Sequence, residues 1–424
     1  MAVFDTGPID NRNAPRTTLL TIRLFNTGRK SAIAEIEAYY INPAGSGLAS
    51  KTLYVLNSAS LNPFNKPDCS FTLDNVFANL DVFGVRVVTS GLGANDIAVT
   101  VLEKGAAGQI INEHVLKGEF SRIGELLFVY AANGWVINTG TNTIVGNVSG
   151  LGSVPNGVAI TPDGTRVYIT NNGSASVSVI DSATNTVVAT VPAGNLNPQS
   201  IAITPNGLRA YFCCLNLLGS TVQVIDTGTN TVVASVPVPA FPQGIAITPD
   251  GSTAYVSLGN GTVLLIDTIT NTIVATVPLP VSSDPTGIAI TPDGSRAYVV
   301  ADNDTVPVID TGTLTVIATV PLAAGSFPFA IAITPDGSRA CVANVANGTV
   351  SIINTQTNLV ESTVTLPAGS QPTSIAITPD GMRAYVSNNG NETVSVIILS
   401  NNTVGTLPVG PSPNGIAITP ILLF

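Results

Sequence analysis

The chain has 424 residues, of which 45% are hydrophobic and only 10% charged, with a formal net charge of −10. The first 125 residues hold 11 Lys and Arg against 12 Asp and Glu, whereas the remaining residues hold 5 against 14. This acidic balance argues against nucleic acid and anionic membrane surfaces as partners. No stretch approaches the roughly 18 apolar residues of a membrane helix, so we expect no membrane insertion.

The N-terminal sequence has neither a basic nor an apolar segment of the kind found in secretory signals. We therefore expect synthesis in the cytoplasm and, for any surface location, a route other than the usual export pathway. The four cysteines, Cys69, Cys213, Cys214 and Cys341, lack metal-ligand spacing. Buried free thiols are favoured over disulfides for them, and the sequence leaves their disulfide state open.

Residues 1–16 contain two prolines and several turn formers without any periodicity, which predicts an extended arm. One interpretation is a frayed terminus. The other is an assembly arm, formed by Met1, Ala2, Val3 and Phe4, that adds a strand to a sheet of a neighbouring subunit. On the second interpretation we expect a homo-oligomer or fibre held through the N-terminal domain.

Residues 17–124 contain seven or eight short segments of strand type separated by polar turns. Glu35 and Glu37 alternate with Ala34, Ile36 and Ala38, as expected for a strand with one wet and one buried face. The spacing predicts a single β-sandwich of the jelly-roll or immunoglobulin-like kind.

Residues 125–424 repeat one motif, which is Ile-Ala-Ile-Thr-Pro-Asp-Gly at Ile288–Gly294. Its near-copies begin at Val158, Ile201, Ile245, Ile288, Ile331, Ile375 and Ile416. A period of about 40–45 residues that carries four short strands, named A to D here, is typical of a β-propeller blade.

The two ends of this region predict how the ring closes. Residues 126–148 provide strands B, C and D with no strand A before them, and Ile416–Phe424 provides a strand A with nothing after it. Together they complete a seventh blade, so Ile416, Ala417, Ile418 and Thr419 are the predicted closing strand. The fold class is therefore all-β, a seven-bladed propeller preceded by a small sandwich.

The strand B sequences Tyr168–Asn171, Tyr255–Ser257 and Tyr385–Asn388 resemble the YVTN-type propeller repeat. This resemblance covers about 300 residues and implies the fold. It does not imply one function, because its relatives include surface-layer proteins, sugar lactonases and metal or quinone enzymes.

Most polar residues of the propeller repeat with the blade, which favours structural roles for the turn aspartates and for the arginines that follow them. Asp302 and Asp304 break the repeat and are weak candidates for a cation site. The only histidine is His114, which excludes haem, copper and zinc propeller enzymes by ligand count. We therefore expect no catalytic residues, no cofactor and no enzyme activity.

The patterns TTLLTIRLFNTG, IAVTVLEK and HVLKGEFSRI in the first domain resemble small sandwich modules of endospore surfaces and appendages. This resemblance implies a structural, self-assembling protein of a bacterial spore or cell surface, with the propeller displayed as a rigid head. The alternative is an adhesin-like propeller that binds a glycan, a small molecule or a surface protein. A lactonase-like hydrolase is the third hypothesis.

Overall fold

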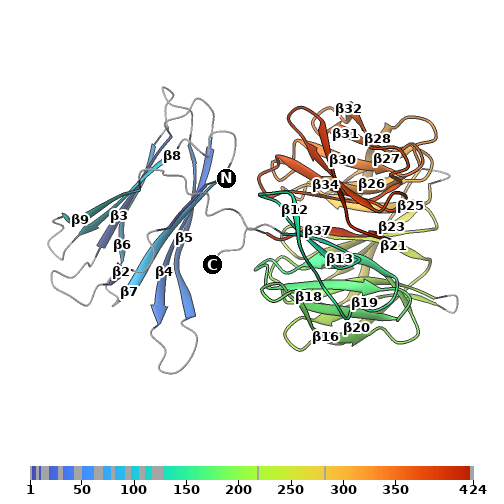
Figure 1. The fold of residues 1–424 in the computed structure, drawn as a ribbon, viewed down its shortest axis with the longest axis horizontal. Coiled ribbons are helices and arrows are strands. Elements are labelled where there is room, and N and C mark those ends of the chain that lie inside the picture. The colour runs from blue at the N-terminus through green and yellow to red at the C-terminus, as the bar shows by residue number, and fades with distance from the viewer. Residues whose placement is uncertain are drawn as a thin grey trace. The chain divides into compact units, whose positions relative to one another are not determined.

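The computed structural model describes residues 128–216, 219–280 and 283–420, together with the backbone of nine strands within residues 2–116. The chain divides into two compact units, Met1–Gly124 and Glu125–Phe424. All regular elements of the described residues are strands (Figure 1). None of these residues belongs to a helix long and apolar enough to cross a membrane.

The N-terminal unit contains two antiparallel sheets. The first sheet contains β1 (Ala2–Asp5), β2 (Ile9–Asp10), β7 (Val82–Ser90), β4 (Ala32–Asn42) and β5 (Ser50–Leu61). The second has the order β6 (Ser70–Phe77), β3 (Leu19–Asn26), β8 (Ile97–Lys104) and β9 (Ile110–Leu116). The packing of the two sheets into a sandwich depends on side chains outside the described residues and stays a prediction.

The second unit is a seven-bladed propeller, as the sequence predicts, and each blade is a four-stranded antiparallel sheet (Figure 1). The first three complete blades, strand A first, are β13 (Pro155–Ile160), β14 (Arg166–Asn171), β15 (Ser176–Asp181) and β16 (Thr186–Pro192); β17 (Asn197–Ile203), β18 (Arg209–Leu215), β19 (Ser220–Asp226) and β20 (Thr231–Val238); β21 (Pro242–Ile247), β22 (Thr253–Leu258), β23 (Thr262–Asp267) and β24 (Thr272–Pro278). Blades 4 to 6 are β25 (Pro285–Ile290), β26 (Arg296–Ala301), β27 (Thr305–Asp310) and β28 (Thr315–Pro321); β29 (Pro328–Ile333), β30 (Arg339–Asn344), β31 (Thr349–Asn354) and β32 (Leu359–Thr365); β33 (Pro372–Ile377), β34 (Arg383–Asn388), β35 (Thr393–Ile398) and β36 (Thr403–Pro408).

The seventh blade joins the two ends of the propeller chain, which confirms the predicted closure. It consists of β37 (Ile416–Ile418), β10 (Phe128–Ala131), β11 (Trp135–Asn138) and β12 (Thr143–Asn147). In its register Ile416 faces Ala131 and Ile418 faces Val129. Thr419 extends this pairing because its N–H donates to the carbonyl of Phe128 and its hydroxyl accepts the Phe128 N–H, both at 2.8 Å. We call this sheet the closing blade.

The core lies between neighbouring blades. Strands B and C are buried nearly throughout, whereas strand D alternates between exposed and partly buried residues, as in Thr315–Pro321. Both faces of each sheet are covered, since Cys213 packs into one apolar cluster and its neighbour Cys214 into the next. Successive residues of a strand point to opposite faces, so one strand serves two interfaces.

A buried tyrosine of strand B links most blades to the next. The Tyr168 hydroxyl donates to Asn230 Oδ1 at 2.8 Å, and Tyr298 donates in the same way to Asn358 at 2.7 Å. The same bond joins Tyr130 to Asn185, Tyr211 to Asn271 and Tyr385 to Asn142. Each of these asparagines adopts a positive φ in the C–D turn, a conformation that asparagine tolerates well.

The inner strands approach one another closely at one level of the ring. A Cβ on Gly244 would lie 2.3 Å from the carbonyl oxygen of Thr286, and one on Gly415 would lie 2.1 Å from that of Asn156. Small residues occupy this position in all seven blades, namely Gly157, Ser200, Gly244, Gly287, Ala330, Ser374 and Gly415.

Candidate functional site

Antiparallel pairing puts the D–A loops and B–C turns at one end of the propeller, the D–A face, and the A–B and C–D turns at the other, the A–B face. On the D–A face each blade carries an exposed residue directly before the proline that begins, or nearly begins, strand A. We call these seven residues the rim. They are Val154, Asn197, Phe241, Asp284, Phe327, Gln371 and Ser412.

The rim residues differ from blade to blade, but most of their backbones are held in the same way. The carbonyl of Phe241 accepts the Gly259 N–H at 2.9 Å, and that of Phe327 accepts the Val345 N–H at 3.1 Å. Equivalent bonds from the B–C turn reach Val154, Asp284 and Gln371. Variable side chains on a fixed backbone are typical of binding sites carried by a rigid scaffold.

Four rim residues have a left-handed backbone. The φ angles are 51° for Val154, 48° for Phe327, 47° for Gln371 and 56° for Ser412. A positive φ is a true outlier for a β-branched or bulky residue, and such strain clusters at functional sites.

The exposed aromatic side chains of the described propeller residues all lie on the D–A face. Phe241 is 48% exposed, Phe327 46% and Phe329 39%. By contrast, Tyr130, Tyr168, Tyr211, Tyr298 and Tyr385 are fully buried. An exposed aromatic ring gives a ligand a flat apolar surface against which to pack.

A carboxyl group lies beside Phe241. A methyl group on Gly259 would lie 3.2 Å from Asp284 Oδ1 and 3.8 Å from Phe241 Cβ, so both side chains border this B–C turn. Partial burial, and then the charge of Asp302, raise the pKa of the Asp284 carboxyl. The arrangement places a group suited to proton transfer next to an aromatic surface.

The two predicted cation candidates hold loops together. Asp302 Oδ1 accepts the Asp284 N–H at 2.9 Å, and the carboxylate of Asp304 accepts N–H groups of Gly325 at 2.6 Å and Phe327 at 2.9 Å. In the described part of the chain, no three His, Cys, Asp or Glu side chains gather as metal ligands would. Both carboxylates therefore stabilise the D–A loops through these hydrogen bonds.

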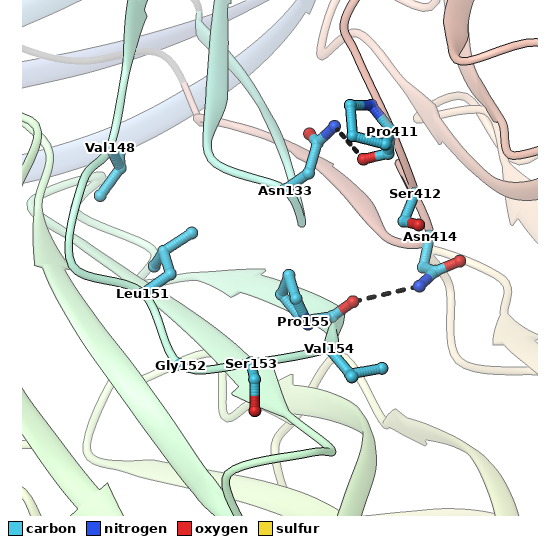
Figure 2. Close-up of a pocket in the computed structure, with 10 residues that line it drawn as sticks. All are labelled: Asn133, Val148, Leu151, Gly152, Ser153, Val154, Pro155, Pro411, Ser412 and Asn414. Atoms are coloured by element: carbon cyan, nitrogen blue, oxygen red, sulfur yellow. Dashed lines mark hydrogen bonds between the residues drawn. The ribbon is translucent and has the colours of Figure 1, made fainter.

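A cavity of about 450 Å³ opens where the closing blade meets blade 1 (Figure 2). Its lining comes from Asn133, Val148, Leu151, Gly152, Ser153, Val154, Pro155, Pro411, Ser412 and Asn414, with no charged side chain. Hydrogen bonds join the first and last segments of the propeller beside this cavity. Asn133 donates to Pro411 O at 2.9 Å, and Asn414 donates to Pro155 O at 3.1 Å (Figure 2).

On the A–B face the repeated aspartates are bound by their own turns, which confirms the structural role predicted for them. Asp293 accepts the Thr291 hydroxyl at 2.5 Å and the Ser295 N–H at 3.0 Å. The repeated arginines have structural roles too, but their hydrogen-bond partners differ from blade to blade. Arg166 pairs with Asp181 at 2.6 Å, whereas Arg296 donates to Thr355 O of the next blade at 2.7 Å.

The predicted assembly arm begins with a strand, because Ala2–Asp5 pairs with β7 of the same chain, and Ala2 faces Thr89. Met1 lies outside the described residues, and donation of this strand to another subunit stays a prediction. Cys213, Cys214 and Cys341 are free and buried, whereas Cys69 lies outside the described residues. Burial raises the pKa of the Cys213 thiol to about 12, so it is unreactive.

Sequence reasoning did not single out the rim. The signal that could have found it is one position, the residue before the repeated proline, that changes in almost every blade while its neighbours repeat.

Comparison with known proteins supports the propeller. A family model described as a lactonase, seven-bladed β-propeller, matches residues 239–410. A hydrazine synthase structure from Kuenenia stuttgartiensis is 24% identical with a TM-score of 0.57, covering 65% of this chain and 94% of its own. A functionally unknown protein from Desulfotomaculum acetoxidans is 21% identical with a TM-score of 0.58, covering 69% and 98%. No curated protein matches the sequence.

These similarities show a seven-bladed propeller, and they contradict the function that we expected. The prediction of a structural protein of a spore or cell surface is wrong, because the matching family model is that of a lactonase propeller and the similar structures include a hydrazine synthase. The physical reason for the error is that the expectation rested on a sequence resemblance of the N-terminal unit and on missing histidines, not on the residues of the D–A face.

Proposed function

We propose that the propeller is an enzyme-like small-molecule binder whose rim takes up a neutral sugar or sugar lactone. The observation that carries the proposal is that all exposed aromatic side chains of the described propeller residues, Phe241, Phe327 and Phe329, lie on the face where the repeat varies. Pockets that bind small molecules combine apolar and aromatic surface with a few polar groups that fix orientation. The amides of Asn197 and Gln371 are polar groups of this kind.

The charge of the rim favours a neutral ligand. Asp284 is its one ionisable member, and the five arginines of the propeller all begin strand B at the other face or lie beside it. A phosphorylated sugar would therefore find a carboxylate and no cation. The region that matches the lactonase model, 239–410, contains four of the seven rim residues, including both phenylalanines and Asp284.

A second candidate function, hydrolysis of the lactone, is favoured by the Asp284–Asp302 pair. The Asp284 carboxylate would take a proton from water while the water oxygen attacks the lactone carbonyl carbon. The ring C–O bond then breaks, and the departing alkoxide takes up the proton to give the open hydroxy acid. The raised pKa of Asp284 makes the carboxylate a better base. A general base of this kind contributes about 10²–10⁴-fold to the rate.

Binding is tested by calorimetric titration with D-glucose and D-glucono-1,5-lactone. Phe241→Ala is expected to weaken binding about fivefold, because one aromatic contact contributes roughly 1 kcal/mol. The matched control is Ile269→Ala, since Ile269 is an apolar residue, 85% exposed, in a turn of the opposite face. Equal losses in the two variants, or no binding by the wild type, would reject the proposal.

Turnover is tested separately with a pH-stat on the same lactone. If the second function holds, Asp284→Asn removes hydrolysis above the uncatalysed rate while ligand binding persists. If the wild type binds the lactone but does not hydrolyse it, the binding function stands and the hydrolytic function is rejected.

The finer resemblance to YVTN-type repeats remains a proposal, as do a surface location and self-association through the N-terminal unit. Analytical ultracentrifugation of the full chain beside a variant without residues 1–15 tests the last of these.

A further inference from the structure

The cavity where the closing blade meets blade 1 has the features of a binding site of its own. Its volume of about 450 Å³ falls within the range of small-molecule pockets, about 300–1,000 Å³. The walls combine the apolar side chains of Leu151, Val154 and Pro155 with amides and hydroxyls (Figure 2). It lies apart from the phenylalanines of the rim, which belong to blades 3 and 5.

Three polar groups of the lining have no hydrogen-bond partner among the described residues. Asn133 gives its amide nitrogen to Val409 O and Pro411 O, both at 2.9 Å, but its buried Oδ1 has no donor. The hydroxyls of Ser153 and Ser412 also make no hydrogen bond within the described part of the chain. A buried unpaired oxygen is uncommon in native proteins and needs a structural or functional explanation.

Backbone strain borders the same cavity. Val154 and Ser412 adopt φ angles of 51° and 56°, the first of which is a rare conformation for a β-branched residue. The Val154 carbonyl accepts the Asn172 N–H at 2.9 Å and the Ser153 carbonyl accepts the Gly173 N–H at 3.0 Å, so the loop is fixed in this shape. Strain that surrounding contacts enforce is typical of ligand clamps.

We propose that this cavity binds one neutral molecule of about monosaccharide size, and that its occupation holds the propeller ring closed. The absence of charge from the ten lining residues favours a ligand without charge. An apolar side of the ligand packs on Leu151, and its hydroxyls pair with Ser153 and Ser412. Val154 and Ser412 belong to the rim as well, but none of the exposed phenylalanines lines the cavity, so Phe241→Ala distinguishes this site from that of the proposed function.

The coupling to ring closure follows from the origin of the walls. Residues 133–155 belong to the beginning of the propeller chain and residues 411–414 to its end, next to the strand that closes the ring. A ligand that contacts both segments binds only the closed ring, so it stabilises that state by mass action. Opening of β10 from β37 is then slower when the cavity is filled.

The test uses the full chain with D-glucose and D-glucono-1,5-lactone, and glucose 6-phosphate as the charged counterpart. At 100 times Kd a neutral probe is expected to raise Tm by roughly 5 °C. Hydrogen exchange should slow in peptides from β10 and β37 and stay unchanged in β22. Leu151→Trp fills the cavity and should abolish both effects. Leu196→Trp, at a partly buried leucine of the next D–A loop outside the cavity, should keep them.

A second pair of variants covers the case in which Leu151→Trp does not fold. Ser412→Asn and Glu392→Asn both replace a left-handed residue with one that tolerates this conformation, but only Ser412 lines the cavity, and Glu392 lies outside the rim as well. Ser412→Asn should weaken binding at least tenfold and Glu392→Asn should not. Equal behaviour of the pair, or a Tm unmoved by either neutral probe, would overturn the inference. Binding lost only in Phe241→Ala would keep the proposed function and reject this site.

Discussion

The two faces of the propeller are built from the same seven repeats but use polar side chains differently. On the A–B face the Asp250 carboxylate accepts the Thr248 hydroxyl and the Ser252 N–H, and the aspartates of blades 1, 4, 5 and 6 repeat this turn. On the D–A face the rim residues vary, are all exposed, and most hold their place through the backbone alone.

The aspartates of the two faces also differ in their acidity. Hydrogen bonds, first from the Thr291 hydroxyl and then from Ser295, lower the pKa of Asp293. Burial and the neighbouring charge of Asp302 raise that of Asp284. A carboxylate bound by donors serves the fold, whereas a carboxyl with raised pKa is available for chemistry. In a repeat protein, the position that stops repeating is therefore the one at which to look for function.

We expect the largest loss of stability from a substitution in the inner strands A, because these strands support both faces of the propeller. Gly244→Ala places a Cβ 2.3 Å from the Thr286 carbonyl oxygen, and neither backbone can move without opening a seam. We expect a loss of about 3 kcal/mol, measured by urea unfolding. Ala330→Gly at the same level of another blade is the control and should cost about 1 kcal/mol or less. Similar values for the two would show that the inner strands are not in close contact.

The next largest change in stability is expected from a substitution that restores the Tyr–Asn hydrogen bond missing on the A–B face. Leu314 occupies the C–D turn position that asparagine holds in the other blades, with a φ of 57°, and Tyr255 of the preceding blade thereby lacks the Tyr–Asn bond. Leu314→Asn relieves the left-handed leucine and supplies an acceptor, so we expect a gain of about 1–2 kcal/mol in unfolding free energy.

The double variant Leu314→Asn, Tyr255→Phe provides the control for this repair. It should lose the part of the gain that depends on the hydroxyl, about 1 kcal/mol. An unchanged gain would assign the whole effect to the turn.

The sequence predicts the parts of the molecule that depend on local repetition. The closing role of Ile416–Ile418 follows from counting strands, and the role of Asp293 follows from its place in a tight turn. The meeting of Phe241 with Asp284 could not be predicted in this way. They are 43 residues apart, and only the curvature of the ring brings both to Gly259. The unpaired oxygen of Asn133 likewise depends on which carbonyls of the distant chain end its amide nitrogen reaches.

Acid should weaken the A–B face first. Because the pKa values of Asp250 and Asp293 are lowered on folding, their stabilisation is complete above their ordinary value of 3.8 and is lost as pH falls through the folded values. We expect a nearly constant Tm above about pH 5 and a decline below about pH 4. At pH 7 Asp293→Ala should cost about 1 kcal/mol.

Asp293→Asn is the matched variant for the acid response. It should be milder, because Asn206 occupies this turn position in blade 2 and accepts the Thr204 hydroxyl at 2.7 Å. Both variants should still lose stability in acid, because the remaining turn aspartates titrate in each. A Tm that rises on acidification would contradict the structural role of these aspartates.

The smallest effect carries the opposite sign and belongs to the D–A face. A raised pKa means that the folded protein disfavours the Asp284 carboxylate, so its charge costs stability above the folded pKa and costs nothing below 3.8. Solvent screens this partly exposed group, so Asp284→Asn should raise the unfolding free energy by only about 0.3 kcal/mol at pH 7. The gain should vanish at pH 3.5. Thermal unfolding at both pH values, with Ile269→Asn as a neutral surface control, decides the sign. A loss of stability at pH 7 would mean that Asp284, like Asp293, serves the fold.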